Sequence, residues 1–217
     1  MQIIIADDHP VALMGLRALL TEQNEVFQVV GEAYNGCELL QILAKRTCDL
    51  LITDFSMPTG HDSIDGLSLL KRVRRSYPNL PIIVLTMIHN PTLISGMYRA
   101  GAQAVVEKAA FTREMLLAIH IVANGGIYQN NQIRTDEPPS RSTVPAETNR
   151  CRIATLSPTE AEIVRLYVGG FTVTQIAEKL RRSAKTVSRQ KSDAMRKLNL
   201  ATSLDLYDYA KTYGLVF

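Results

Sequence analysis

Five short runs rich in Val, Ile and Leu recur through the first half of the chain, and each is followed by a stretch with helical periodicity. The runs show no polar alternation, which is typical of strands buried on both faces of a parallel sheet. We expect strands at residues 3–6, 28–31, 50–53, 82–86 and 104–107, and helices at residues 11–21, 36–45, 67–76, 92–100 and 113–124. Five successive strand–helix units predict a doubly wound α/β domain with a five-stranded parallel sheet.

After Gly125-Gly126 this alternation ends. Residues 130–150 hold almost no large apolar side chain, which predicts a flexible linker. Beyond it, Ser157-Pro158-Thr159-Glu160 resembles a helix capping box, and Thr172 and Ser183 can each cap a further helix. Helices are expected at residues 158–168, 173–180, 184–198 and 204–212. We therefore predict an N-terminal domain at residues 1–126, a linker at 127–152 and an all-α four-helix domain at 153–217.

The two halves of the chain differ in charge. Residues 1–149 hold 12 Lys and Arg against 15 Asp and Glu, a net charge of −3. Residues 150–217 hold 12 basic and 6 acidic residues, a net charge of +6. The basic half is therefore the candidate for binding nucleic acid, although many solvated surfaces are also basic.

Composition favours a cytoplasmic bacterial protein that does not enter a membrane. The apolar runs are too short to span a bilayer, and two acidic residues stand where a signal peptide needs a basic and then an apolar stretch. The spacing of the cysteines predicts reduced thiols rather than a disulfide or zinc site, and the histidines are expected to be solvated. These residues are Cys37, Cys48 and Cys151, and His9, His61, His89 and His120.

Polar residues gather where the predicted strands end. Asp7 and Asp8 follow the first strand, Asp54 follows the third, Thr86 ends the fourth and Lys108 follows the fifth. Open parallel sheets bind ligands at this edge. Three carboxylates together repel one another unless a cation such as Mg²⁺, which prefers oxygen ligands, lies among them. Each residue alone has an ordinary interpretation as a loop former, an N-cap or a solvated lysine, but their joint placement favours phosphoryl chemistry beside Mg²⁺.

This arrangement resembles the receiver domain of two-component response regulators, and the resemblance covers residues 2–125. The segment Ala-Asp-Asp-His-Pro at residues 6–10 is typical of the subfamily with a helix-turn-helix domain. The resemblance implies that Asp54 is the phosphoacceptor, that Thr86 is a switch hydroxyl and that Lys108 pairs with the phosphoryl group.

The same resemblance implies the metal ligands. Asp8 and Asp54 would bind Mg²⁺ directly, Asp7 mostly through water and Ser56 through its backbone carbonyl.

Three features depart from the usual receiver pattern. A short insertion follows Met57-Pro58, and Val105 stands where an aromatic switch residue is common. Met87 and Ile88 are bulky and apolar beside Thr86. We expect this pair to hinder water and to lengthen the lifetime of a phosphoryl group.

The helix expected at residues 184–198 has two distinct faces. An apolar face suited to a core carries Val187, Ala194, Met195 and Leu198. A small, polar and basic face carries Lys185, Ser188, Arg189, Ser192 and Arg196. Such a face can enter a DNA major groove, although a merely solvated amphipathic helix has the same pattern.

The surrounding residues resemble the LuxR/FixJ-type helix-turn-helix domain of NarL/FixJ regulators over residues 155–200. The resemblance rests on Leu-Ser-Pro-Thr-Glu-Ala-Glu at 156–162, Gly170, Ile176-Ala177, Lys185-Thr186-Val187 and Lys197-Leu198. It makes residues 184–198 the recognition helix. Candidates for base contact are Ser188, Arg189 and Ser192, and candidates for phosphate contact are Lys185, Thr186, Lys191, Arg196 and Lys197.

A narrower resemblance is to the capsule-synthesis regulators of Rcs phosphorelays. It is carried by Gly-Phe-x-Val-Thr-x-Ile-Ala-x-Lys-Leu at 170–180 and by Arg-Ser-x-Lys-Thr-Val-Ser-x-Gln-Lys at 182–191. It implies phosphate transfer from a histidine kinase or histidine phosphotransfer protein. It also implies homodimers, heterodimers with an auxiliary regulator, and RNA polymerase as a partner.

Together these features predict a transcriptional regulator and not an enzyme. We expect it to bind double-stranded DNA as a dimer, under the control of phosphorylation of Asp54. Phosphorylation is expected to alter the face formed by the fourth and fifth helices and the last strand. One alternative is a Mg²⁺-dependent phosphatase, but such enzymes carry a second Asp where this chain has Ser56. Another alternative is a phosphate-independent dimerisation module in place of the receiver.

Overall fold

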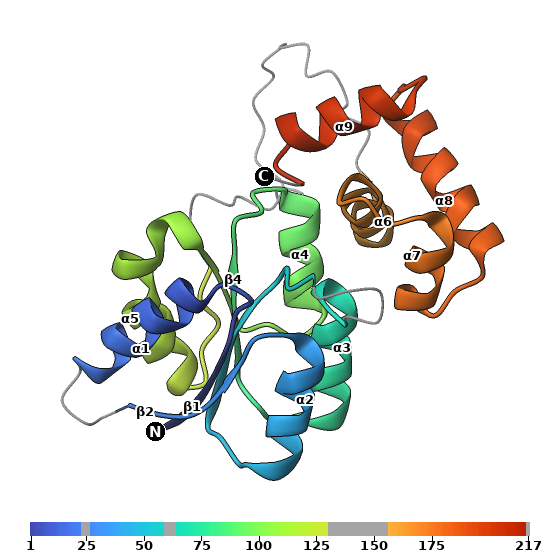
Figure 1. Cartoon of the computed structure of the whole chain (residues 1–217). Coiled ribbons are helices and arrows are strands. Elements are labelled where there is room, and N and C mark those ends of the chain that lie inside the picture. Colours follow the sequence, from blue (N-terminus) through green and yellow to red (C-terminus); the bar gives the residue numbers. More distant parts are fainter. Residues whose placement is uncertain (23–26, 59–63, 130–155, 216–217) are drawn as a thin grey trace, which may run out of the picture.

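The computed structural model describes residues 1–22, 27–58, 64–129 and 156–215. Its N-terminal half is built on one parallel sheet with the strand order β2-β1-β3-β4-β5 (Figure 1). The strands are β1 (Gln2–Ala6), β2 (Gln28–Ala33), β3 (Leu50–Asp54), β4 (Ile82–Thr86) and β5 (Ala104–Glu107). The predicted five-stranded α/β class is confirmed. The order reverses between β1 and β3, which is where sheets of this kind bind ligands.

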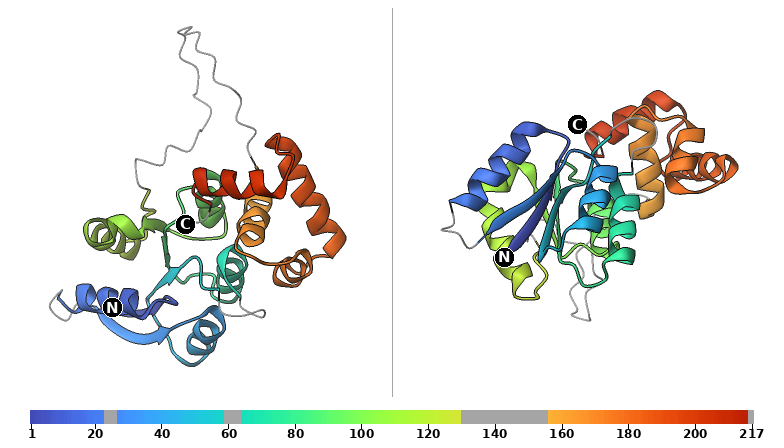
Figure 2. Two further views of the ribbon diagram at one scale, coloured as in Figure 1. Left: turned by 45° about the horizontal axis from the view of Figure 1, so that its top comes forward. Right: turned by 60° about the horizontal axis from the view of Figure 1, so that its bottom comes forward.

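Helices cover both faces of the sheet. α1 (Pro10–Thr21) and α5 (Phe111–Ala123) lie side by side on one face, and α2 (Gly36–Lys45), α3 (Gly66–Ser76) and α4 (Pro91–Arg99) lie on the other (Figures 1 and 2). Four of the predicted helices, α1, α3, α4 and α9 (Ser203–Thr212), begin one residue earlier than predicted, and α5 begins two residues earlier. In α1 and α4 the first helical position is a proline, Pro10 or Pro91, which costs no hydrogen bond there.

The central strands bury side chains in both directions, as their unbroken apolar sequences require. In β1, Ile3 and Ile5 pack toward α1 and α5, whereas Ile4 packs toward α2, α3 and α4. All three are fully buried. Apolar cores on both faces of the sheet therefore fix the position of the sheet edge that carries the acidic residues.

The C-terminal half contains α6 (Pro158–Val168), α7 (Val173–Leu180), α8 (Ala184–Lys197) and α9 (Ser203–Thr212). The capping box at Ser157 is present as predicted, and Thr172 and Ser183 cap α7 and α8. Thr202 forms a further capping box at α9. Caps satisfy the free amides of the first turn, so each short helix starts at a defined residue.

The two halves pack against each other through α4 and α6 (Figure 1). Ile94 and Met97 of α4 share one buried apolar cluster with Ala161 and Val164 of α6. The close approach uses Gly96, where an added Cβ would lie 3.1 Å from Cβ of Pro158.

Most of the predicted linker lies outside the described residues. At its start, the Tyr128 amide donates to the Gln103 carbonyl (2.8 Å) beside β5, so the packed N-terminal half reaches past the predicted boundary at residue 126. Within the described part of the chain, no helix combines the length and apolarity needed to cross a bilayer.

Candidate functional site

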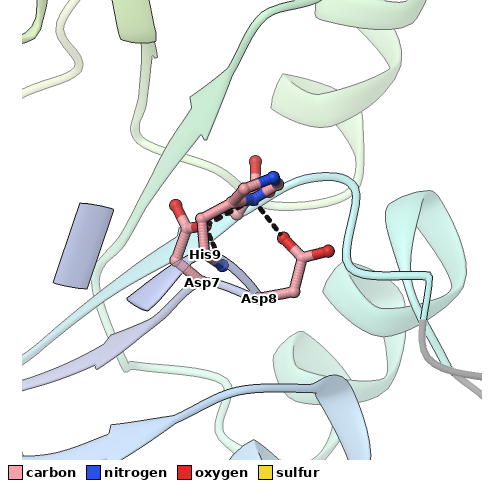
Figure 3. Close-up of side chains that lie close together, drawn as sticks. Asp7, Asp8 and His9 are labelled. Carbon is pink, nitrogen blue, oxygen red and sulfur yellow. Dashed lines mark hydrogen bonds and ion pairs between the residues drawn. The ribbon is translucent and has the colours of Figure 1, made fainter. Parts of the chain in front are cut away.

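The predicted acidic residues converge at the carboxyl edge of the sheet. Asp7 and Asp8 follow β1, and Asp54 is the last residue of the neighbouring strand β3. Together with His9, each offers a ligand atom, and these atoms lie within 4.8 Å of one another. Asp7 and Asp54 are buried. Figure 3 shows the Asp7, Asp8 and His9 side chains turned toward one another.

Lys108 places its ammonium group between two of these carboxylates. It begins the 3₁₀ turn after β5, and its Nζ lies 2.7 Å from Asp7 Oδ2 and 3.1 Å from Asp54 Oδ2. Burial would lower the pKa of Lys108, but Asp54 and Asp7 outweigh burial and raise it. The ammonium therefore stays charged and close to where a phosphoryl group on Asp54 would lie.

Asp54 is the most perturbed carboxyl group of the site. Burial is the main reason that its pKa is raised to about 6, with Lys108 opposing the shift and Asp7 and Asp8 adding to it. Lys108 therefore does not supply enough positive charge to offset the cost of burying the ionised Asp54 carboxylate. A cation bound at the site would relieve this deficit.

The donor set fits a hard divalent cation. Asp7 Oδ2 and Asp8 Oδ1 are buried and, among the described residues, have no partner with hydrogen-bond geometry. Their close neighbours are the Lys108 ammonium and His9 Nδ1, the latter 2.8 Å from Asp8 Oδ1. His9 is exposed, as predicted, yet it lies against the carboxylates. Carboxylate oxygens that need positive charge are the ligands Mg²⁺ prefers.

The hydroxyl and apolar residues of the site lie in and after β4 and within β5. Thr86 is buried, and its Oγ1 accepts a hydrogen bond from the Ile88 amide (2.9 Å). Ile88 is buried and Met87 is partly exposed, at 40 %. Val105 is buried in the α4 side of the core. The short insertion falls on residues 59–63, which lie outside the described part, as does His61.

A buried ionic cluster next to this site was not predicted. Arg165 of α6 lies between Glu162, whose Oε2 is 2.9 Å from Nε, and Asp65, whose Oδ2 is 3.3 Å from Nη2. Lys179 of α7 lies 3.6 Å from the other oxygen of Asp65. Arg165 Nη1 also donates to Ser56 Oγ at 3.0 Å. No local pattern revealed the whole cluster. Glu162 and Arg165 are three residues apart, but Asp65 and Ser56 lie about 100 residues before Arg165 in the sequence.

The predicted recognition helix is α8, and its polar face is open. The exposed side chains on this face are Lys185, Ser188, Arg189, Ser192 and Arg196. The opposite face buries Val187 and Ala194. In Figure 1, α8 lies on the side of the C-terminal half away from the sheet, so packing of the halves leaves it uncovered.

Four of the five predicted phosphate contacts have other partners. Arg196 Nη2 lies 2.7 Å from Asp193 Oδ1. Lys197 Nζ lies 2.8 Å from both carboxylate oxygens of Glu160. Lys191 Nζ lies 4.0 Å from the centre of the Tyr167 ring. At the start of α8, the Thr186 amide donates to the Ser183 hydroxyl, and the two hydroxyl oxygens lie 2.7 Å apart. Lys191 and Lys197 therefore link α8 to α6, whereas the polar face of α8 stays exposed.

Comparison with known proteins identifies relatives for both halves. Residues 3–120 match the response regulator receiver domain, and residues 154–210 match the luxR family of bacterial regulatory proteins. The transcriptional regulatory protein RcsB of Escherichia coli is 39% identical over 215 residues, covering 99% of this chain and 96% of that protein.

Two solved structures are similar over nearly the whole chain. One is RcsB from Salmonella enterica serovar Typhimurium bound to the rprA promoter with the phosphomimetic beryllofluoride; its TM-score is 0.80 at 36% identity, covering 98% of this chain and 99% of that one. The other contains two RcsB dimers bound to two parallel DNAs; its TM-score is 0.75 at 37% identity, covering 96% and 97% of the two chains.

Proposed function

The chain belongs to the response regulators, as a DNA-binding transcriptional regulator with a receiver domain and a luxR-type helix-turn-helix domain, and from this premise we propose that phosphorylation of Asp54 controls its binding to DNA. The observation that carries the proposal is the buried group of Asp7, Asp8 and Asp54 beside Lys108, which combines a carboxylate nucleophile with sites for cation and phosphoryl binding.

In the proposed reaction, an Asp54 carboxylate oxygen attacks the phosphorus atom of a phosphohistidine on a histidine kinase or phosphotransfer protein. The P–N bond breaks, its electron pair returns to the imidazole, and an acyl phosphate forms on Asp54. Asp8, Asp54 and the Ser56 carbonyl would hold Mg²⁺, with Asp7 acting through water. When bound, Mg²⁺ supplies charge that neutralises the phosphoryl oxygens.

Two further residues then act on the phosphoryl group. Lys108 is already within 3.1 Å of Asp54 and pairs with the added negative charge. Thr86 ends the adjacent strand β4 and donates its hydroxyl to a phosphoryl oxygen. Buried Ile88 limits the approach of water, which lengthens the lifetime of the acyl phosphate.

For DNA, the exposed face of α8 enters the major groove. Ser188, Arg189 and Ser192 are the proposed base contacts, and Lys185 and Arg196 the main proposed phosphate contacts. To reach phosphate, Thr186, Lys191 and Lys197 must leave the partners that they have here, and Arg196 must leave Asp193. The domain's net positive charge supports non-specific attraction to the duplex.

We further propose that the active form on DNA is a homodimer, since the RcsB structure cited above contains dimers on DNA. Dimerisation through the whole predicted face of α4, β5 and α5 conflicts with the packing of α4 on α6. Exposed apolar side chains lie on both α1 and α5: Val11 is 78%, Met14 71% and Leu117 53% exposed. We propose these two helices as the better candidate for the dimer surface.

Heterodimers with an auxiliary regulator and a contact with RNA polymerase remain proposals from the narrower family resemblance.

The test of the proposed function is incubation with acetyl phosphate and Mg²⁺, followed by intact mass. The wild type gains one phosphoryl group, and Asp54→Asn gains none. Absence of the added mass in the wild type, with normal folding, would exclude control through Asp54 and favour the phosphate-independent dimerisation module.

A further inference from the structure

We propose that Arg165, in the first helix of the DNA-binding domain, is a positioning residue for the metal and phosphoryl site of the receiver domain, acting through Ser56. The inference rests on the proposed function, because it concerns how that site is held. It extends the function across the domain boundary: the DNA-binding domain would help to set the affinity of the receiver for its cation.

The contacts of Arg165 begin one residue after Asp54. Its guanidinium carbon lies 5.1 Å from the centre of the Phe55 ring, and its Nη1 donates to Ser56 Oγ at 3.0 Å. The Arg165 side chain is buried beneath this loop, at 7% exposure. A side chain from α6 thus holds the residue whose carbonyl is a proposed cation ligand.

Phe55, the residue before Ser56, is fixed by backbone hydrogen bonds through both its amide and its carbonyl. The Phe55 amide donates to the Leu85 carbonyl at 2.9 Å, and the Phe55 carbonyl accepts from the Gly66 amide at 2.8 Å. These bonds leave the Ser56 peptide as the next group along the chain to be oriented. The hydrogen bond from Arg165 holds the side-chain hydroxyl of the same residue and so limits how the Ser56 backbone can turn.

The receiver backbone is shaped to let α6 approach. Gly66 has φ +58°, and a Cβ there would collide with the Glu162 carboxylate. The Leu67 amide donates to Glu162 Oε1 at 3.3 Å. Asp65, the N-cap residue of α3, makes no capping bond and instead pairs with Arg165. The start of α3 therefore serves the domain interface at the expense of its own cap.

The charges around Arg165 are balanced. Two carboxylates, Glu162 and Asp65, face two cations, Arg165 and Lys179. Burial alone would lower the pKa of Arg165, but the two carboxylates hold it above its ordinary value. Because the cluster has no net charge, its effect on a nearby divalent cation is mainly geometric rather than electrostatic.

The experiment measures divalent affinity in the full chain, with Mn²⁺ as the probe, by electron paramagnetic resonance of the free ion. The variants are Ser56→Ala, Arg165→Lys and the double substitution. Ser56→Ala removes only the hydroxyl and leaves the ionic cluster intact. Arg165→Lys keeps the charge but lacks the planar fork that reaches Glu162 and Ser56 together. Lys211→Ala is the control, because Lys211 lines a cavity between the two domains that Ser56 and Arg165 also line.

Each single substitution is expected to weaken Mn²⁺ binding by about three- to tenfold, from the loss of one hydrogen bond. The double variant should be no weaker than the weaker single variant, because both remove the same contact. In acetyl phosphate reactions, the Mg²⁺ concentration for half-maximal rate should rise while the rate at saturating Mg²⁺ stays unchanged. Lys211→Ala should match the wild type in both measurements.

Unchanged Mn²⁺ affinity in Ser56→Ala, or multiplied losses in the double variant, would overturn the inference. Neither result would touch the proposed function, because phosphoryl gain by the wild type is measured separately by mass. Conversely, a wild type that binds Mn²⁺ but gains no phosphoryl group would defeat the proposed function and leave the coupling of Arg165 to the cation site intact.

Discussion

Asp54 is buried among other carboxylates, and this placement both disfavours its charge and prepares it to bind a cation. Its pKa of about 6 applies to the site without metal. The carboxylate must lose its proton before it binds a cation, so binding of the cation and release of the proton are linked.

Cation binding at the acidic site should depend on pH through Asp54. Between pH 7 and pH 5 the ionised fraction of Asp54 falls about tenfold for a pKa of about 6, so cation affinity should fall by a similar factor. Titrations with Mn²⁺ at the two pH values test this. Asp54→Asn is the control for the other titratable groups of the site. Equal pH dependence in the wild type and the variant would assign the effect to other groups.

Binding to DNA should depend on Arg189. Arg189 is 85% exposed on α8, with Asp193 3.8 Å away. Arg189→Ala should weaken binding to a selected operator by ~1–3 kcal/mol and relax sequence preference at one position. Binding to operator duplexes and to base-substituted duplexes by fluorescence anisotropy measures both. A uniform loss on all sequences would make Arg189 a phosphate contact, and no loss would remove it from the interface.

The strands could be predicted from the sequence because their unbroken runs of apolar residues match strands that are buried on both faces. β1, β3, β4 and β5 lie within one residue of their expected positions. β2 is two residues longer than expected, since its last residues, Glu32 and Ala33, continue the pairing with β1. The acidic site was predictable for the same reason: parallel strands bring their carboxyl ends to one edge.

The start of a helix could be predicted where the sequence contains a capping residue. In α7, the Gln175 amide donates to Thr172 Oγ1 at 3.3 Å, and Gln175 Oε1 accepts from the Thr172 amide at 2.8 Å. Thr172→Ala should lower the free energy of unfolding by ~1 kcal/mol. Urea unfolding measures this. Thr174→Ala, at an exposed position in the first turn of the same helix, should be neutral or slightly stabilising, and an equal loss there would show that Thr172 does not act as a cap.

At the scale of the whole molecule, the packing of α6 on α4 was not predictable. The apolar faces of both helices are explained equally well by separate domain cores, so periodicity alone does not pair them. Asp65, Glu162 and Arg165 each resemble a surface charge in sequence. Their pairing appears only when α3 and α6 are placed together.

The domain packing itself is open to a direct test. Because a Cβ on Gly96 would lie 3.1 Å from Pro158 Cβ, a Gly96→Cys, Pro158→Cys variant needs only a small shift to reach disulfide geometry, with Cβ atoms about 3.5–4.5 Å apart. Mild oxidation should form an intramolecular crosslink, seen by intact mass, that neither single variant forms. Beryllofluoride with Mg²⁺ should not slow it, because coupling between sites is reciprocal. A crosslink abolished by beryllofluoride would contradict the coupling proposed for Arg165.

We expect the phosphoryl state of Asp54 to set the affinity of α8 for DNA. The most direct measurement is fluorescence anisotropy on an operator duplex obtained by selection from genomic fragments, with and without Mg²⁺ and beryllofluoride. The wild type should bind about 5- to 150-fold more tightly with beryllofluoride, the usual range for coupled sites, and Asp54→Ala should not respond. Equal affinity of the wild type in both conditions, or an equal response in Asp54→Ala, would contradict the account.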